Sequence, residues 1–263
     1  MRVWKILYPI GIHFAGIQAV ATLPVLFLMT SQQRALPSSW LLYINLAGTL
    51  ISVPFTLWLF QRDQKKRGIC PCISWQQLSM GNAALLLFMG MGLSQYLNML
   101  LNVLQLFNRF PQYTESMDAI WSAHSPVVIF LWSALAAPLS EELVFRWLIY
   151  KRLRDWTGVK AAVFISSVLF GLYHGNVVQF LYAAVMGCIL ALVIEWTGSP
   201  LASILVHMGA NLWSTIVSLY GTYILENELL LSVYSILMIA MLAGIIGGFY
   251  HFVRGSRRFR RKS

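Results

Sequence analysis

The chain has 263 residues, of which 58% are hydrophobic and 11% are Asp, Glu, Lys or Arg. Soluble globular domains carry about 25% charged residues, so this composition excludes an ordinary soluble protein, and the mean hydropathy of +0.67 agrees. The net charge of +10 would suggest nucleic-acid binding in a soluble protein, but the basic residues lie in short segments between apolar runs. We therefore predict an integral membrane protein with no nucleic-acid partner.

Apolar runs long enough to cross a hydrocarbon core, which takes about 20 residues per helix, recur along the whole chain. The sequence lacks the alternating ten-residue segments that are typical of a membrane β-barrel. We therefore predict an all-α, polytopic membrane protein, a bundle of about eight transmembrane helices. The predicted spans, in chain order, are Leu7 to Met29, Trp40 to Phe60, Asn82 to Leu106, Pro126 to Tyr150, Val159 to His174, Val177 to Trp196, Pro200 to Tyr220 and Leu229 to Val253.

The Lys and Arg residues are distributed unequally between the two sides of this bundle. With eight spans and the N-terminus inside, 16 of the 19 fall in inner segments or in the C-terminal tail, as the positive-inside rule describes. Arg34 and Arg109 fall outside, and Arg146 lies within a span. We predict that both termini are cytoplasmic, in a bacterial cell membrane, and that the first span is retained and not cleaved as a signal peptide.

The three cysteines indicate no disulfide framework. Cys70 and Cys72 lie in a basic loop, where two cysteines alone supply half of a structural zinc site, and Cys188 lies in an apolar run.

Ionisable residues inside apolar spans are costly, by about 2.5 to 3.5 kcal/mol for the charged types on insertion scales. Glu142 and Arg146 are spaced i, i+4 and can pair, which offsets much of that cost. Glu141 points about 100° away from Glu142 around the helix, so we expect it to project into the bundle interior, where a carboxyl group can act as a base. The alternative is a silent, permanently protonated Glu141.

Two further spans carry polar side chains. His174 ends the segment that begins at Phe170, which lies one turn away on the same helix face. His207 and Asn211 form an i, i+4 pair on the seventh span and offer hydrogen-bond donors at one place. A rise of about 1.5 Å per residue puts these polar groups and Glu141 in one central slab of the membrane. These groups can therefore converge on one site.

Three ordered motifs make the chain resemble a family of membrane-embedded endopeptidases, the CPBP family (CAAX protease and bacteriocin-processing, also Abi). It includes the eukaryotic prenyl-protein CAAX endopeptidase and bacterial relatives linked to bacteriocin self-immunity. The motifs are Glu141 to Arg146 for E-E-x-x-x-R, Phe170 to His174 for F-x-x-x-H, and His207 to Asn211 for H-x-x-x-N. Each is weak alone, but their order and their placement on separate spans make the combination specific. The resemblance covers Pro126 to Tyr220.

The resemblance implies an intramembrane protease. In that family the first glutamate and the histidine of the second motif activate water, and the histidine and asparagine of the third motif form an oxyanion hole. Carried over, the catalytic residues are Glu141, His174, His207 and Asn211, supported by Glu142, Arg146 and Phe170. The implied division of the chain is 1–125 for N-terminal transmembrane helices and a basic cytoplasmic loop, 126–220 for the catalytic membrane core, and 221–263 for the last helix and a basic tail.

A metal mechanism is the nearest alternative. Family members have been labelled metalloproteases, and Glu141, His174 and His207 could give zinc three ligands with an open fourth position. However, the sequence has no H-E-x-x-H helix, and Asn211 is a poor zinc ligand but a good oxyanion donor. We therefore expect no cofactor, with zinc as the alternative.

Two functions of other classes stay open. One is a proton- or ion-coupled transporter, because intramembrane Glu and His residues also mark relays. The other is a non-catalytic scaffold or immunity protein, in which polar groups tie helices together. For a protease, the expected partners are the lipid bilayer and a peptide or protein substrate near the inner leaflet. No motif identifies the substrate or the biological role.

Overall fold

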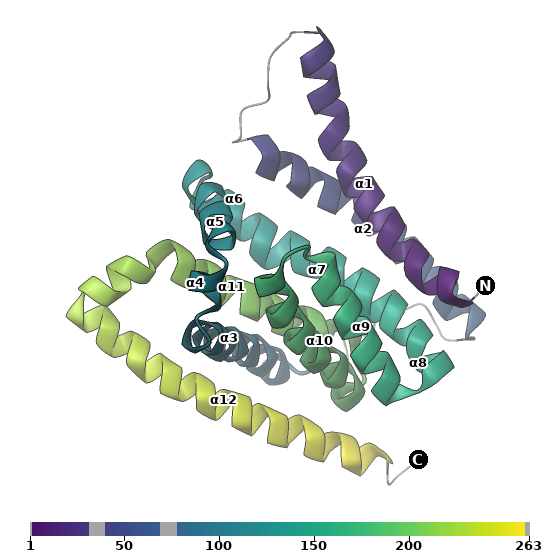
Figure 1. Cartoon of the computed structure of the whole chain (residues 1–263). Helices are drawn as coiled ribbons and strands as arrows, with labels where there is room; N and C mark the ends of the chain where they lie inside the picture. The colour runs from purple at the N-terminus through teal and green to yellow at the C-terminus, as the bar shows by residue number, and fades with distance from the viewer. Residues whose placement is uncertain (1, 32–39, 69–77, 261–263) are drawn as a thin grey trace. The chain divides into compact units, whose positions relative to one another are not determined.

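The computed structural model describes residues 2–31, 40–68 and 78–260, and Figure 1 shows the chain. Every regular element in these ranges is helical, which confirms the predicted all-α class. Six described helices are long and apolar enough to cross a membrane, and two shorter apolar helical stretches, Val3–Ile17 and Val159–Tyr173, accompany them. These eight segments overlap the eight predicted spans, and six of them meet the length of a membrane span. Most of the predicted basic loop lies outside the described residues, and so do its two cysteines, Cys70 and Cys72.

The helix bounds overlap each predicted span, although the third predicted span runs past the end of its helix at Val103 and the fourth consists of four consecutive helical elements. Two short helices, α4 and α5, lie between α3 and α6. The elements are α1 Arg2–Ser31, α2 Leu41–Lys66, α3 Met80–Val103, α4 Leu106–Arg109, α5 Pro111–Ala123, α6 Pro126–Phe130, η3 Leu131–Ala136, α7 Ala137–Glu142, η4 Leu143–Tyr150, α8 Lys151–Thr157, α9 Val159–Tyr173, α10 Val177–Thr197, α11 Pro200–Glu226 and α12 Glu228–Arg260. Helix α5 was not predicted, because it is too short and too polar for a membrane span, and none of its residues is buried.

The fourth span is a succession of α-helical and π-helical turns. Pro126–Thr157 forms one candidate membrane span, within which η3 and η4 are π-helical. A π-helix bonds residue i to i+5; it is rare, and it is frequently found at functional sites. Because η4 begins at Leu143, the E-E-x-x-x-R motif starts on α-helical turns and ends on a wider coil. Nothing in the apolar pattern of this span signals that change.

The chain forms two compact units, each described here by itself. Unit 1 comprises the described residues of Met1–Ile73 and Ser116–Ala162, and unit 2 those of Ser74–Glu115 and Val163–Ser263. The predicted division at 125 and 220 follows the coverage of the motifs and not helix packing, so it stays a prediction.

In unit 1, α1 and α2 lie side by side (Figure 1), and both contact η4. The contact of α2 with η4 includes Phe60 and Trp147, whose ring centroids are 4.8 Å apart. All eight residues of η4 are buried. The helix that carries the first motif is therefore enclosed by the first two helices of the chain.

In unit 2, α3 and α11 cross at a distance that only glycine permits. A Cβ on Gly90 of α3 would lie 2.8 Å from the carbonyl carbon of Val206 and 3.0 Å from the backbone nitrogen of Ala210. On α11, a Cβ on Gly209 would lie 2.9 Å from the carbonyl carbon of Leu87. Small residues at membrane helix interfaces permit such close backbone approach. Gly209 is the middle residue of the H-x-x-x-N motif.

The last helix packs against α3 by the same device. A Cβ on Gly244 would lie 2.7 Å from the Phe88 ring, and one on Gly248 would lie 2.7 Å from Cγ of Met89. The two glycines are four residues apart and so lie on one face of α12. The aromatic ring of Phe88 and the thioether of Met89 occupy the space that these glycines leave.

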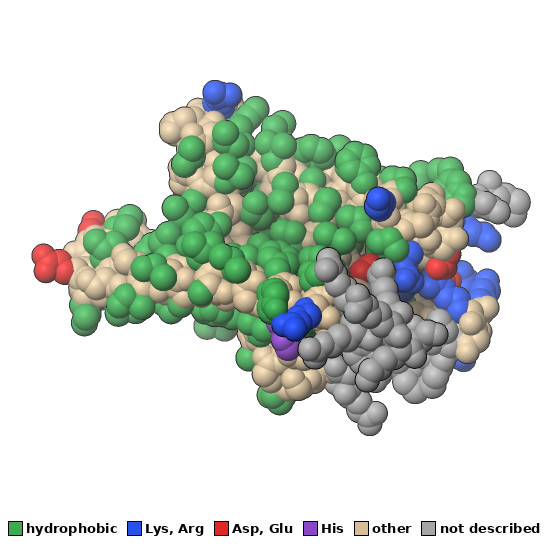
Figure 2. Space-filling model, turned by 90° about the horizontal axis from the view of Figure 1, so that it is seen from below, with side chains coloured by type: hydrophobic (Ala, Val, Ile, Leu, Met, Phe, Trp, Pro, Cys, Tyr) green, Lys and Arg blue, Asp and Glu red, His purple; other side chains and the backbone are tan. Residues whose placement is uncertain are grey.

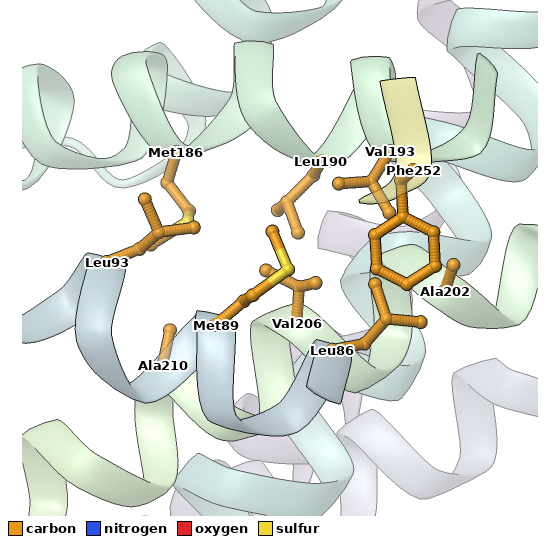
Figure 3. Packing of buried hydrophobic residues seen from close by; sticks show 10 residues of the cluster. All are labelled: Leu86, Met89, Leu93, Met186, Leu190, Val193, Ala202, Val206, Ala210 and Phe252. Atoms are coloured by element: carbon orange, nitrogen blue, oxygen red, sulfur yellow. The ribbon is translucent and has the colours of Figure 1, made fainter. Parts of the chain in front are cut away.

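A hydrophobic cluster fills the interior of unit 2 (Figure 3), with residues from α3, α10, α11 and α12. Met89 points from α3 toward Leu190 of α10, and both side chains are fully buried. The flexible thioether of methionine fills irregular gaps of this kind. The members of the cluster are Leu86, Met89, Leu93, Met186, Leu190, Val193, Ala202, Val206, Ala210 and Phe252.

We predict that Gly209→Ala destabilises the protein, because the added methyl group meets backbone and not the end of a flexible side chain. Overpacking of this kind costs about 1 to 3 kcal/mol. Gly247→Ala on α12 is the matched control, because a Cβ there meets nothing within 4 Å and alanine favours helix by up to about 1 kcal/mol. Thermal unfolding in detergent, followed by tryptophan fluorescence, is the measurement. Equal melting temperatures for the two variants would contradict the prediction.

Candidate active site

The E-E-x-x-x-R motif forms a buried ion pair in unit 1. Arg146 Nε lies 3.4 Å from Glu142 Oε2, and neither side chain has any exposed surface. The predicted i, i+4 pair is therefore confirmed. Two charges that leave water together need each other, because removal of either one strands the other in a medium of low dielectric constant. This pair orients the segment that carries the motif.

The two adjacent glutamates occupy different environments. Glu142 at the end of α7 is wholly buried, whereas Glu141 is half-buried. Neighbouring residues on a helix point in different directions. Because Glu142 points toward Arg146, Glu141 points into different surroundings. Glu141 thus retains access that Glu142 lacks, as a general base requires.

In unit 2, the phenylalanine of the second motif touches both motif histidines. The Phe170 ring centroid lies 4.9 Å from that of His174 and 5.7 Å from that of His207, and both pairs are T-shaped. The first contact joins residues of one chain segment, and the second joins α9 to α11. Phe170 is buried, so its ring is held in place, and both imidazole rings pack against it.

A backbone hydrogen bond determines which nitrogen of His174 carries a proton. Nδ1 of His174 lies 2.9 Å from the carbonyl oxygen of Phe170. A carbonyl oxygen can only accept, so Nδ1–H donates. In the neutral imidazole, Nε2 is then the nitrogen with the lone pair. His174 can therefore accept a hydrogen bond from a water molecule or coordinate a metal through Nε2.

The turn that follows α9 also fixes the backbone of His174. Gly175 has φ of 72°, a left-handed conformation that ends helices and favours glycine. Asn176 then caps α10, where its side chain accepts a hydrogen bond from the backbone nitrogen of Gln179 and donates one to the carbonyl oxygen of His174 at 3.2 Å. A helix-ending glycine followed by a capping asparagine is a signal that the sequence itself carries.

The third motif lies in the most tightly packed part of α11. His207 is 5% exposed, and Asn211, one turn further along, is half-buried. Two residues beyond, the indole nitrogen of Trp213 donates a buried hydrogen bond of 2.7 Å to Oε1 of Gln95 on α3. Together with the glycine contacts, this bond fixes the rotation of α11 and hence the face that carries the motif.

The structure brings Phe170, His174 and His207 together in unit 2, and Glu142 with Arg146 in unit 1. The approach of Glu141 to the histidines stays a prediction. Among the described residues, no group of three His, Cys, Asp or Glu side chains forms a metal-binding cluster. The zinc alternative would take one ligand from unit 1 and two from unit 2. A histidine that donates Nδ1–H to a backbone carbonyl is also typical of metal ligands, so His174 fits either mechanism.

Comparison with known proteins bears on the same segment. Residues 123–213 match a family model described as Rce1-like, type II CAAX prenyl endopeptidase Rce1-like. That range contains all three motifs. The predicted resemblance to the CAAX endopeptidase family is confirmed.

One curated relative matches over a similar length. The chain is 31% identical over 94 residues to a protein of Bacillus subtilis (strain 168) named "Putative membrane peptidase YdiL". The alignment covers 36% of this chain and 38% of that protein, so the chain spans little more than a third of the relative that it matches. No solved structure gives a significant match. The chain is an integral, multi-pass membrane protein, and its residues 123–213 resemble CAAX prenyl endopeptidases.

We predict that breaking the buried ion pair on one side destabilises unit 1 more than removing it altogether. Glu142→Gln or Arg146→Met alone should cost about 3 to 5 kcal/mol, because each leaves an uncompensated buried group. The double variant should recover part of that loss. Unfolding of the purified variants in detergent measures the coupling, and strictly additive losses would contradict a direct pair.

Proposed function

We propose that the protein is an intramembrane endopeptidase that hydrolyses peptide bonds of membrane-associated substrates. The observation that carries this proposal is the pairing of His174 and His207 on one buried ring inside a segment that matches CAAX prenyl endopeptidases. The name of the Bacillus subtilis relative, a putative membrane peptidase, agrees with it. The proposed setting is a bacterial cell membrane with both termini cytoplasmic and the scissile bond near the inner leaflet.

Glu141 is proposed as the general base that takes a proton from water. His174 accepts the other hydrogen of that water through Nε2, since its Nδ1–H is committed to the carbonyl oxygen of Phe170. The oxygen of the water attacks the peptide carbonyl carbon, and the proton held by Glu141 passes to the leaving amine. One carboxyl group thus serves both proton transfers, and no step requires a metal.

His207 and Asn211 are proposed to stabilise the oxyanion that develops in this reaction. Both side chains can donate, and both lie on one face of α11. Donors that are fixed before the reaction cost no reorganisation at the transition state. The glycine crossing of α11 with α3 and the Trp213 hydrogen bond supply that rigidity. The buried Glu142–Arg146 pair orients the helix of Glu141 and holds no reacting atom.

The test is a cleavage assay in liposomes with a library of membrane-anchored peptides. Glu141→Gln and His174→Ala should each abolish cleavage, because one removes the base and the other the water ligand. Glu195→Gln on α10 and His251→Ala on α12 are matched controls: they make comparable changes outside the three motifs. Both controls should cleave as the wild type does. All variants are compared by melting temperature to verify that they fold.

The same assay decides the metal question. Cleavage that survives a strong chelator supports the glutamate mechanism. Chelator-sensitive cleavage that added zinc restores would replace it with the zinc alternative, in which Glu141, His174 and His207 would be ligands. A folded wild type that cleaves nothing in a broad library would instead favour a scaffold or a transporter.

We predict that Asn211→Ala lowers the turnover rate by about 10² to 10³, the usual loss for one oxyanion-hole donor. The effect should fall on kcat and leave KM nearly unchanged, because the oxyanion forms only in the transition state. Steady-state kinetics on one cleaved peptide measure both constants. A rise in KM with unchanged kcat would assign Asn211 to substrate binding.

A further inference from the structure

Unit 1 contains a second polar feature, remote in sequence from the three motifs. The start of α1, the end of α2 and α8 enclose a pocket of about 560 Å³, a volume within the range of small-ligand sites. Five basic side chains line it against two acidic ones, Asp63 and Asp155, which leaves a net charge of +3. The basic residues are Lys5, Arg62, Lys66, Arg67 and Arg152.

Arg152 ties the three helices of this pocket together. Its guanidinium donates to Oδ2 of Asp63 on α2 at 2.6 Å and to the Tyr8 hydroxyl on α1 at 2.9 Å. It also donates to the backbone carbonyl of Lys5. The guanidinium carbon lies 5.0 Å from the centroid of the Tyr8 ring. The walls of the pocket are therefore held by the protein itself.

Both acidic side chains of the pocket already form ion pairs with arginines. Asp63 pairs with Arg152 at 2.6 Å, and Asp155 pairs with Arg67 at 2.7 Å. Within the part of the chain that the structure describes, no carboxylate forms an ion pair with the other three basic groups, Lys5, Arg62 and Lys66. An anion that enters the pocket would meet this excess charge.

The aromatic surroundings place the pocket at the membrane interface. Trp4 is 70% exposed, Trp58 52% and Trp156 44%, and Trp156 also lines the pocket. Exposed tryptophans at the ends of membrane helices lie at the level of the lipid headgroups. Figure 2 shows Lys and Arg side chains gathered together, with Asp and Glu side chains among them. The anion most available at that depth is the phosphate of a phospholipid.

We propose that this pocket binds the headgroup of an anionic phospholipid, with Lys5 and Lys66 on its phosphate. Basic pockets between membrane helices bind acidic headgroups in this way. The proposal is independent of the proteolytic activity.

The test uses the full-length protein in a neutral detergent, titrated with phosphatidylglycerol or phosphatidylcholine while the melting temperature is followed. Phosphatidylglycerol should raise the melting temperature and phosphatidylcholine should not. Lys5→Gln/Lys66→Gln should weaken the apparent affinity for phosphatidylglycerol by about 25-fold, from roughly fivefold for each lysine. Both lysines are exposed, so the variant should fold.

Lys65→Gln/Lys160→Gln is the matched control. It removes two exposed lysines of the same unit that do not line the pocket, and its affinity should equal that of the wild type. If both double variants lost affinity for phosphatidylglycerol equally, diffuse surface charge would explain the effect and the proposal would be overturned. No loss of affinity in either variant would also overturn it. Glycerol 3-phosphate, inorganic phosphate and an acidic peptide are the competing probes. Stabilisation by any of them as strong as that by the lipid would also overturn the assignment.

Discussion

A hydrocarbon core offers no hydrogen-bond partners, and this constraint accounts for most of what the structure shows. Each polar group inside the bundle must find its partner within the protein. Glu142 and Arg146 neutralise each other with no exposed surface, and Trp213 bonds to Gln95 across α11 and α3. Polar groups inside a membrane are costly, and leucine in their place would cost less. They are present because they orient their helices or take part in chemistry.

Close backbone approach is the second means by which unit 2 is built. Lipid tails are as apolar as leucine, so burial alone does not drive membrane helices together, and packing must do so. Gly90 and Gly209 bring α3 and α11 into backbone contact, and Gly244 and Gly248 receive the side chains of Phe88 and Met89. The helix that carries His207 is thereby held at a fixed rotation, as proposed for an oxyanion hole.

The polar features of unit 1 serve two different ends. The ion pair of the first motif lies among fully buried residues, whereas the pocket of α1, α2 and α8 is lined by charges in excess of their partners. The first arrangement is self-sufficient and rigid. The second can accept an external anion, which is the difference between a structural pair and a binding site.

The sequence by itself determined the class, the helices and the motif residues. Span length and the scarcity of charge predict membrane helices, and a spacing of four residues is enough to predict the Glu142–Arg146 pair and the contact of Phe170 with His174, because these are properties of one helix. Only the tertiary structure decided that Phe170 also contacts His207 from α11, that Gly209 is a packing residue, and that η4 is π-helical. Those facts depend on which helix faces approach each other, and no single helix encodes its neighbour. The basic pocket is of the same kind: its charges are visible in the sequence as three separate clusters, and they become one site only when three helix ends meet.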